Sequence, residues 1–342
     1  MSGLGGVAIG LLGDVMLGRM VAEALGRQPP EALWAPELRE LTGSLDLVVC
    51  NLECCLSARG RPTTLIEGKP FFFRGPPTAV DALRAINVHA VGLANNHALD
   101  FGEDALRDTL ELLHDAGIAT AGAGLGPEAA RRAAVLPAAD LRLGLVAVAD
   151  HPGQYAAAPG QLGVAQAPMR DEPPEWLLRE VAAARERSDL VIVFPHWGPN
   201  MATRPTTRQH RIVARLHAAG ADLIAGHSAH VFHGVGWSGG PVIFDLGDAL
   251  DDYIVDPVLR NDLGVLAIWR PGADPQLELV GLRLDYCHTR LADGIDADWI
   301  AARLGDACRE LGTTVTRTAE QRYVRRSNGR ERRAGRVGHV LP

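Results

Sequence analysis

Polar residues able to bind cations or transfer protons recur where short apolar runs of the sequence end. In AVGLANNHALDFG, residues 90–102, a run of small apolar residues stops at Asn95, Asn96 and His97. The ends of other runs supply Asp14, Asn51, Glu53, His151, His196, His227 and His230. Carboxylate and amide oxygens together with imidazoles suit one or two divalent cations. The same groups can transfer protons that lie within about 3 Å of them. This recurrence indicates one shared site.

The stretch NLECCLS adds a thiol to these candidates. Side chains of an extended chain alternate between two faces, so Asn51, Glu53 and Cys55 are expected on one face and Cys54 on the other. This places Cys55 beside the carboxylate. The alternative is that both cysteines are small buried apolar residues. The five cysteines are odd in number and form no regular framework, which is typical of a reducing cytoplasm.

The apolar runs predict the elements that must position these groups. Continuous Val, Ile and Leu runs are typical of strands buried on both faces. Residues 103–118 and 174–187 show the three-and-four spacing of helices, so strands and helices alternate. In such sheets ligands gather at the carboxyl ends of the strands. After residue 230 the strands are shorter and separated by turns, which predicts antiparallel pairing, and a last helix is expected over about 296–311.

Composition indicates a globular protein without a membrane segment. Of 342 residues 47% are hydrophobic and 22% charged, and no run reaches the roughly 18 apolar residues that a membrane span requires. GLGGVAIGLLG lacks the features of a signal peptide and is interpreted as a first buried strand, so we expect a cytoplasmic protein with no membrane partner. Residues 317–342 hold eight Arg against two Glu. We interpret this basic segment as a solvated tail, with no nucleic acid as partner.

Six motifs carry a resemblance to a known family. GDVMLGR, NLE, ANNHALDFG, PHWG, GHSAHV and DLGD follow one another as in the bacterial capsule-synthesis CapA (poly-γ-glutamate synthesis) family, and the resemblance covers roughly residues 7–250. It implies an α/β fold like that of calcineurin-like metallophosphoesterases, a four-layer α/β/β/α sandwich with the site at one edge. We expect this domain to span residues 1–290, and residues 291–342 to form a C-terminal helix and the basic tail.

The resemblance also implies roles for the polar residues. Asn96 matches the phosphoesterase Asn that binds metal, and His97 matches the neighbouring His that faces the substrate. The remaining polar positions of the family are matched by Asp14, Glu53, His196, His227 and His230.

Departures from the family pattern change the expected chemistry. Met16 stands where phosphoesterases have a His, and Ser228 and Ala229 replace a His and a Pro. Because the ligand set is thinned in this way, we expect no metal or other cofactor. The sequence resembles a soluble CapA-like branch found with lasso-peptide biosynthesis genes, whose characterised member is a metal- and cofactor-independent epimerase of a peptide's C-terminal residue.

The resulting prediction is a cofactor-independent peptide epimerase. One group would remove the Cα proton and another would return it from the opposite face, with His and a carboxylate opposed by Cys55 or a second His. The partners would be a lasso-type precursor peptide and a leader-peptide-binding protein.

Two alternatives remain at this point. The first is a metal-dependent hydrolase or transferase that acts on phosphoester or γ-glutamyl bonds and binds a divalent ion such as Mn or Zn. Its ligands would be Asp14, Glu53, Asn96, His196, His227 and His230. The second is a non-catalytic assembly protein that keeps the fold.

Overall fold

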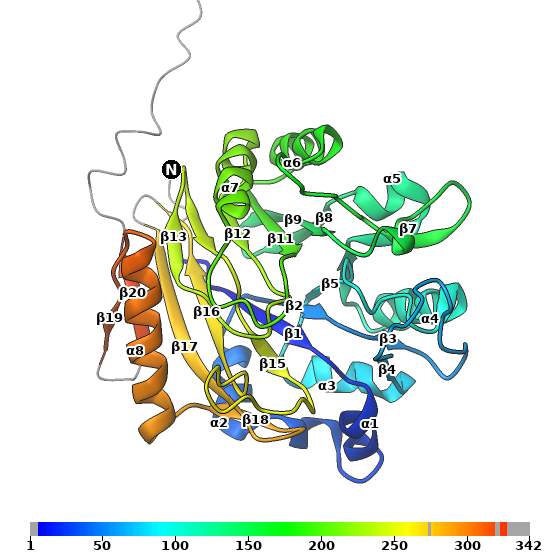
Figure 1. The fold of residues 1–342 in the computed structure, drawn as a ribbon, viewed down its shortest axis with the longest axis horizontal. Coiled ribbons are helices and arrows are strands. Elements are labelled where there is room, and N and C mark those ends of the chain that lie inside the picture. Colours follow the sequence, from blue (N-terminus) through cyan, green and yellow to red (C-terminus); the bar gives the residue numbers. More distant parts are fainter. Residues whose placement is uncertain (1–5, 273–274, 319–321, 327–342) are drawn as a thin grey trace, which may run out of the picture.

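Two β-sheets stacked face to face form the centre of the computed structural model, which describes residues 6–272, 275–318 and 322–326 (Figure 1). The larger sheet has the order β19-β20-β17-β16-β1-β2-β5-β6, with β15 beside β1 and β18 beside β17. The smaller sheet has the order β13-β14-β12-β11-β9-β8.

The strands of the larger sheet are β1 (Ile9–Val15), β2 (Leu47–Leu52), β5 (Ala90–Gly92), β6 (Ala119–Ala121), β15 (Asp248–Leu250), β16 (Leu263–Arg270), β17 (Gln276–Leu284), β18 (Thr289–Leu291), β19 (Thr316–Arg317) and β20 (Arg322–Arg326). Those of the smaller sheet are β8 (Ala134–Ala138), β9 (Leu141–Ala149), β11 (Leu190–His196), β12 (Leu223–Ala225), β13 (Val235–Trp237) and β14 (Pro241–Ile243). Two short pairs join β3 (Cys55–Leu56) to β4 (Arg74–Gly75) and β7 (Ala123–Leu125) to β10 (Leu162–Val164). The α-helices are α1 (Arg19–Leu25), α2 (Pro36–Gly43), α3 (Val80–Ala85), α4 (Gly102–Asp115), α5 (Gly126–Arg131), α6 (Glu175–Arg187), α7 (Thr207–Ala219) and α8 (Gly294–Glu310).

Side-chain alternation along β11 separates two apolar layers. Ile192 and Phe194 belong to the core that the smaller sheet shares with the larger one, whereas Val191 and Val193 pack in a second core with α6 and α7. The sheets approach closely at Gly92 of β5, where an added Cβ would lie 3.0 Å from the Phe194 ring. Helices α2, α3, α4 and α8 pack with the larger sheet (Figure 1). The expected four-layer α/β/β/α sandwich is confirmed.

The predicted helices and buried strands are confirmed within a few residues. The helices expected over 103–118, 174–187 and 296–311 are α4, α6 and α8. Antiparallel pairing after residue 230 is correct for β16 with β17. It is wrong for β14, which runs parallel to β12, and for β15, which runs parallel to β1. β13 and β14 form an antiparallel hairpin, so the chain reverses between them. β14 therefore runs in the same direction as β12.

The C-terminal segment joins the larger sheet. β20 pairs antiparallel with β17, and the hydroxyl of Tyr323 donates to the carbonyl oxygen of Ala297 in α8 over 2.7 Å. The domain boundary expected between residues 290 and 291 falls inside β18. Residues 319–321 and 327–342 of the predicted basic tail lie outside the described residues. In the part of the chain that the structure describes, every helix is too short or too polar to cross a bilayer.

Candidate functional site

Strand ends from both sheets bring the polar residues together. Asp14 lies near the end of β1, opposite Asn51 of the parallel strand β2, and both side chains are buried. β11 ends at His196, which forms a parallel bridge with His227 just after β12. The carboxyl ends of neighbouring parallel strands point to one edge, and this edge holds the site.

Asp14, His196 and His227 form the tightest group. The two Nδ1 atoms of the histidines lie 2.9 Å apart. The Asp14 Oδ1 atom lies 3.2 Å from Nδ1 of His227 and 3.9 Å from Nδ1 of His196. Ligands about 2.05 Å from a tetrahedral zinc ion would be separated by about 3.3 Å. Separations of 2.9 to 3.9 Å are close to this value, so the three side chains make a candidate divalent-cation site.

A second group shares the Asp14 carboxylate. His230 Nδ1 lies 2.9 Å from Asp248 Oδ1 and 3.6 Å from Asp14 Oδ2. Glu53 connects with the first group, because its Oε1 lies 3.8 Å from Nε2 of His196. The hydroxyl of Tyr253 donates to Glu53 Oε2 over 3.1 Å and orients that carboxylate. Two adjacent positions for a cation result, with Asp14 between them.

Partnerless ligand atoms concentrate at this edge. Among the residues that the structure describes, buried atoms without a hydrogen-bond partner include Oε1 of Glu53, Oδ1 of Asn96, Nε2 of His196, Nε2 of His227, Oδ2 of Asp248 and Oδ2 of Asp251. A buried polar atom without a partner costs roughly 1 to 3 kcal/mol, and native proteins contain few of them. Oε1 of Glu53 and Nε2 of His196 are both partnerless and lie 3.8 Å apart, so a cation between them would give both a partner. Oxygens and imidazole nitrogens are the donors that divalent cations bind, so the donor set fits a metal.

Buried charges shift the pKa values in the cluster. Burial would raise the pKa of Asp14, but hydrogen bonding and charge from His227 and charge from His230 outweigh it, and the pKa is lowered. Burial and the charge of Asp14 hold the pKa of Glu53 well above its usual value. His230 has a raised pKa because Asp248, Glu53 and Asp14 overcome the effect of burial. The pKa of His196 lies well below its usual value because of burial and the neighbouring His227. The site thus contains more carboxylates than positively charged histidines.

His97 forms a separate dyad with Asp100. Its Nδ1 lies 2.6 Å from Asp100 Oδ2, and its ring stacks on Phe73 with ring centres 3.9 Å apart. Asp100 also accepts from the backbone N–H of Phe73, from the hydroxyl of Tyr155 and from Lys69. Burial lowers the pKa of His97 to about 4. The neutral imidazole therefore donates from Nδ1 to the carboxylate and keeps Nε2 as an acceptor.

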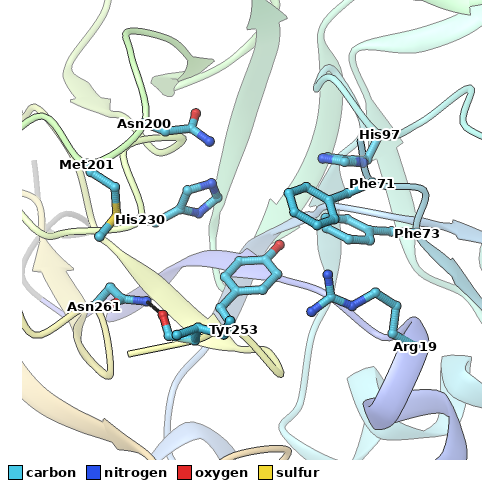
Figure 2. A pocket seen from close by; sticks show the side chains of 10 residues that line it. Arg19, Phe71, Phe73, His97, Asn200, Met201, His230, Tyr253 and Asn261 are labelled. Carbon is cyan, nitrogen blue, oxygen red and sulfur yellow. Dashed lines mark hydrogen bonds between the residues drawn. The ribbon is translucent and has the colours of Figure 1, made fainter. Parts of the chain in front are cut away.

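A cavity of about 330 Å³ adjoins both features (Figure 2). Figure 2 shows His97, Phe71 and Phe73 on one side and His230 on the other, with Tyr253 between the two sides and Arg19 below the phenylalanines. Asn200, Met201, Ile254 and Asn261 complete the lining. A mostly apolar cavity with a few convergent polar groups is the usual form of a small-molecule or side-chain binding site.

The structure brings together six of the eight predicted site residues. Asp14, Glu53, His196, His227 and His230 form the cluster, and His97 lines the adjoining cavity. Asn96 precedes His97 in the chain and has a buried, partnerless side-chain oxygen. Cys55 lies apart from them. β2 ends at Leu52, which interrupts the assumed alternation, and Cys55 begins β3 with its thiol 3.5 Å from the carbonyl oxygen of Phe73. Burial raises the pKa of this thiol, which opposes thiolate formation.

Sequence reasoning missed four residues of the site. Asp248 lies in DLGD and Arg19 ends GDVMLGR, so both motifs contained a signal. Asp100 follows His97 by three residues, a spacing at which side chains can meet. Tyr253 had no sequence signal, because only the fold brings it to Glu53.

Two stacked sheets with a histidine and carboxylate cluster at one edge define an α/β sandwich protein with a candidate metal centre. Residues 8–253 match the family described as bacterial capsule synthesis protein PGA_cap, and the chain belongs to that family.

The chain is also similar to individual proteins. A probable polyglutamine synthesis accessory protein of Mycobacterium tuberculosis is 29% identical over 90% of this chain and 93% of its own length. The PGA biosynthesis protein CapA of Bacillus subtilis is 26% identical over 70% of this chain and 62% of its own. Among solved structures, a phosphatase from Mycoplasma pneumoniae aligns with a TM-score of 0.45 and 14% identity, covering 84% of this chain and 92% of its own.

Proposed function

We propose that this protein is a divalent-metal-dependent hydrolase or transferase that acts on phosphoester or γ-glutamyl bonds. The observation that carries the proposal is the buried cluster of Asp14, His196 and His227, together with the partnerless atoms Glu53 Oε1, His196 Nε2 and His227 Nε2 beside it. One relative is named for PGA biosynthesis, which supports a γ-glutamyl substrate. The expectation that the protein uses no metal is less well supported than the metal-dependent alternative.

Asp248 supplies a ligand that compensates for the histidine missing at Met16. Met16 is buried and offers no hard ligand, but the Asp248 carboxylate lies beside His230 and Asp14 and adds an oxygen there. Asp14, His196 and His227 would hold one ion, with Glu53 adjacent, and Asp14, His230 and Asp248 would hold a second. When bound, the metal would polarise the scissile group and lower the pKa of water.

The chain's own residues supply the remaining functions. His97 presents its unprotonated Nε2 to the cavity and can accept a proton at that atom, while Asp100 holds the ring in position and stabilises the resulting imidazolium. Tyr253 fixes the orientation of Glu53. Phe71 and Phe73 form an apolar wall on one side of the cavity.

Turnover of two chromogenic compounds tests this proposal. Hydrolysis of bis(p-nitrophenyl) phosphate and of γ-glutamyl-p-nitroanilide is measured after chelation and again after addition of Mn²⁺ or Zn²⁺. We expect chelation to abolish turnover and the metal to restore it. His97→Ala should reduce turnover by about 10²-fold, the range for loss of a general acid or base. His114→Ala, on the exposed face of α4, is the matched control. Turnover that survives complete chelation would overturn metal dependence.

Peptide epimerisation is the second candidate, and one observation favours it. His97 and His230 come from different segments and lie on opposite sides of the same cavity (Figure 2). Inversion of a Cα centre needs groups on two faces of that carbon, and this arrangement supplies them without Cys55. A peptide substrate delivered by a leader-peptide-binding protein, as in the lasso-peptide branch, belongs to this candidate. Deuterium incorporation at a peptide Cα in D₂O by the chelated protein would support it, and absence of exchange would count against it.

A further inference from the structure

Arg19 brings a guanidinium to the lining of the cavity, and one edge of this group is held in place. Nε donates to Asp252 Oδ2 over 3.0 Å, and Nη2 donates to Asp252 Oδ1 and to its backbone carbonyl. Nη1 makes no hydrogen bond to any residue that the structure describes. About a third of the Arg19 side chain remains exposed, in the cavity lining. The guanidinium therefore keeps donors for a further acceptor.

Aromatic rings surround the same guanidinium. Its carbon lies 5.6 Å from the ring centre of Phe71, 5.2 Å from that of Phe73 and 5.6 Å from that of Tyr253. Aromatic rings within about 6 Å attract a guanidinium and displace water from that side of it. Lower local polarity strengthens an ion pair, and the planar fork of Arg matches carboxylate and phosphate oxygens.

The backbone at Arg19 is also constrained. Arg19 has a φ of 48°, a left-handed conformation that is uncommon for residues other than glycine. Asp252 accepts from the backbone N–H of Met20 over 2.9 Å as well as from the Arg19 side chain, so one buried carboxylate holds both backbone and side chain. A strained residue held by its surroundings is often found at a ligand site.

Exposed apolar residues border the cavity next to this cation. Ile254 is 94% exposed and lines the cavity, and Phe71 is also exposed there. Val255 and Val258 are exposed on the same segment as Ile254. A ligand with an apolar group beside its anionic group would cover these side chains.

We propose that Arg19 binds an oxyanion of the substrate, a carboxylate or a phosphate, while an adjacent apolar group of the substrate packs against Phe71 and Ile254. This inference rests on the proposed function, because it assigns the substrate class of that same site. A γ-glutamyl unit carries a free carboxylate and a phosphoester carries a phosphate, so the preferred anion indicates which bond class the enzyme cleaves.

Three small probes test the inference. Binding of 3-phenylpropionate, phenyl phosphate and the neutral 3-phenylpropionamide to the full chain is measured by ligand-observed NMR titration, with chelated and with Mn²⁺-loaded protein. We expect one anion to bind and the amide to bind at least 10-fold more weakly. A preference for 3-phenylpropionate identifies a carboxylate site, and a preference for phenyl phosphate identifies a phosphate site.

Variants at Arg19 locate the anion. Arg19→Gln leaves Asp252 buried without its partner, so we pair it with the double variant Arg19→Gln/Asp252→Asn, which removes both charges. Both variants should weaken anion binding at least 10-fold in the presence and absence of Mn²⁺. Arg27→Gln, at an exposed ion pair just after α1, is the matched control.

The apolar contact is tested separately. Ile254→Ser should weaken binding of the anions about threefold or more without changing thermal stability. Ile295→Ser, an exposed position in α8, is the control.

Failure of this inference differs from failure of the metal proposal. Anion binding that requires Mn²⁺ but is unchanged in the folded double variant overturns the role of Arg19 and leaves the metal site in place. Binding that requires Arg19 but not Mn²⁺ supports the inference whatever the metal assay shows. Equal binding of the anions and the amide, or no binding by the wild type, overturns the inference.

Discussion

Replacement of Asp100 by Asn should strongly destabilise the protein. The Asp100 carboxylate is buried and accepts from His97, from the backbone N–H of Phe73 and from Tyr155 at 2.6, 2.7 and 3.0 Å. It also lies 3.2 Å from the ammonium of Lys69, a side chain that is itself largely buried. An Asn side chain keeps one acceptor oxygen, removes the negative charge and directs an NH₂ group at existing donors.

The expected loss of stability follows from these contacts. Removal of one partner of a buried ion pair costs about 3 to 5 kcal/mol, and unmet buried donors cost roughly 1 to 3 kcal/mol each. These terms are not additive because they share one carboxylate. We expect a loss of about 4 kcal/mol in the free energy of unfolding. With an unfolding entropy near 2.1 cal/mol/K per residue, this corresponds to a fall of about 6 °C in Tm.

Urea unfolding of the metal-free protein, followed by tryptophan fluorescence, measures the effect. Asp104→Asn, exposed in the first turn of α4, should change stability by less than about 0.5 kcal/mol. Lys69→Met should restore part of the stability lost in Asp100→Asn, because it removes the unpaired ammonium. A loss below about 1 kcal/mol in Asp100→Asn, or no recovery in the double variant, would refute this account of the dyad.

Three further predictions concern pH dependence, sheet packing and the thiol. Burial lowers the pKa of His233 to about 4, whereas the same side chain binds a proton near pH 6.5 in the unfolded chain. The contribution of neutral His233 to the free energy of unfolding is therefore complete above pH 6.5 and is lost as the pH falls to about 4. Between these two pH values, the free energy of unfolding measured in urea should fall by up to about 3 kcal/mol more in wild type than in His233→Gln. Gly92→Val should destabilise by about 1 to 3 kcal/mol in the same assay, because the added side chain enters the space of Phe194, and an unchanged midpoint would show that the sheets can separate freely. Cys55→Ser should leave metal-dependent turnover within about twofold of wild type, and a loss of 10²-fold would return the thiol to the mechanism.

The sequence identified those parts of the fold that depend on local patterns. Continuous apolar runs marked β1, β2, β5, β9, β11 and β12, and the polar residues at their ends are the residues that meet at the sheet edge. Strand direction after residue 230 depends on chain crossings between sheets, which local periodicity does not encode. For that reason the parallel pairing of β14 and β15 was missed.

Ligands supplied over long sequence separations were also missed. The expectation of no metal counted ligands within motifs, where Met16 and Ser228 stand in place of histidines. Asp248 lies far from Asp14 in sequence, yet β15 pairs directly with β1 and places the two aspartates in register. Cys55 shows the opposite error, because alternation along NLECC was carried past the end of β2 at Leu52.

Direct measurement of bound metal tests the central claim. Purified wild-type protein is chelated, dialysed against a small excess of Mn²⁺ or Zn²⁺ and assayed for metal by mass spectrometry. The account predicts at least one ion per chain, with binding abolished or weakened at least 10-fold in His196→Ala and His227→Ala and unchanged in His114→Ala. Wild-type protein that remains folded and retains less than about 0.1 ion per chain, or variants that retain as much as wild type, would contradict it.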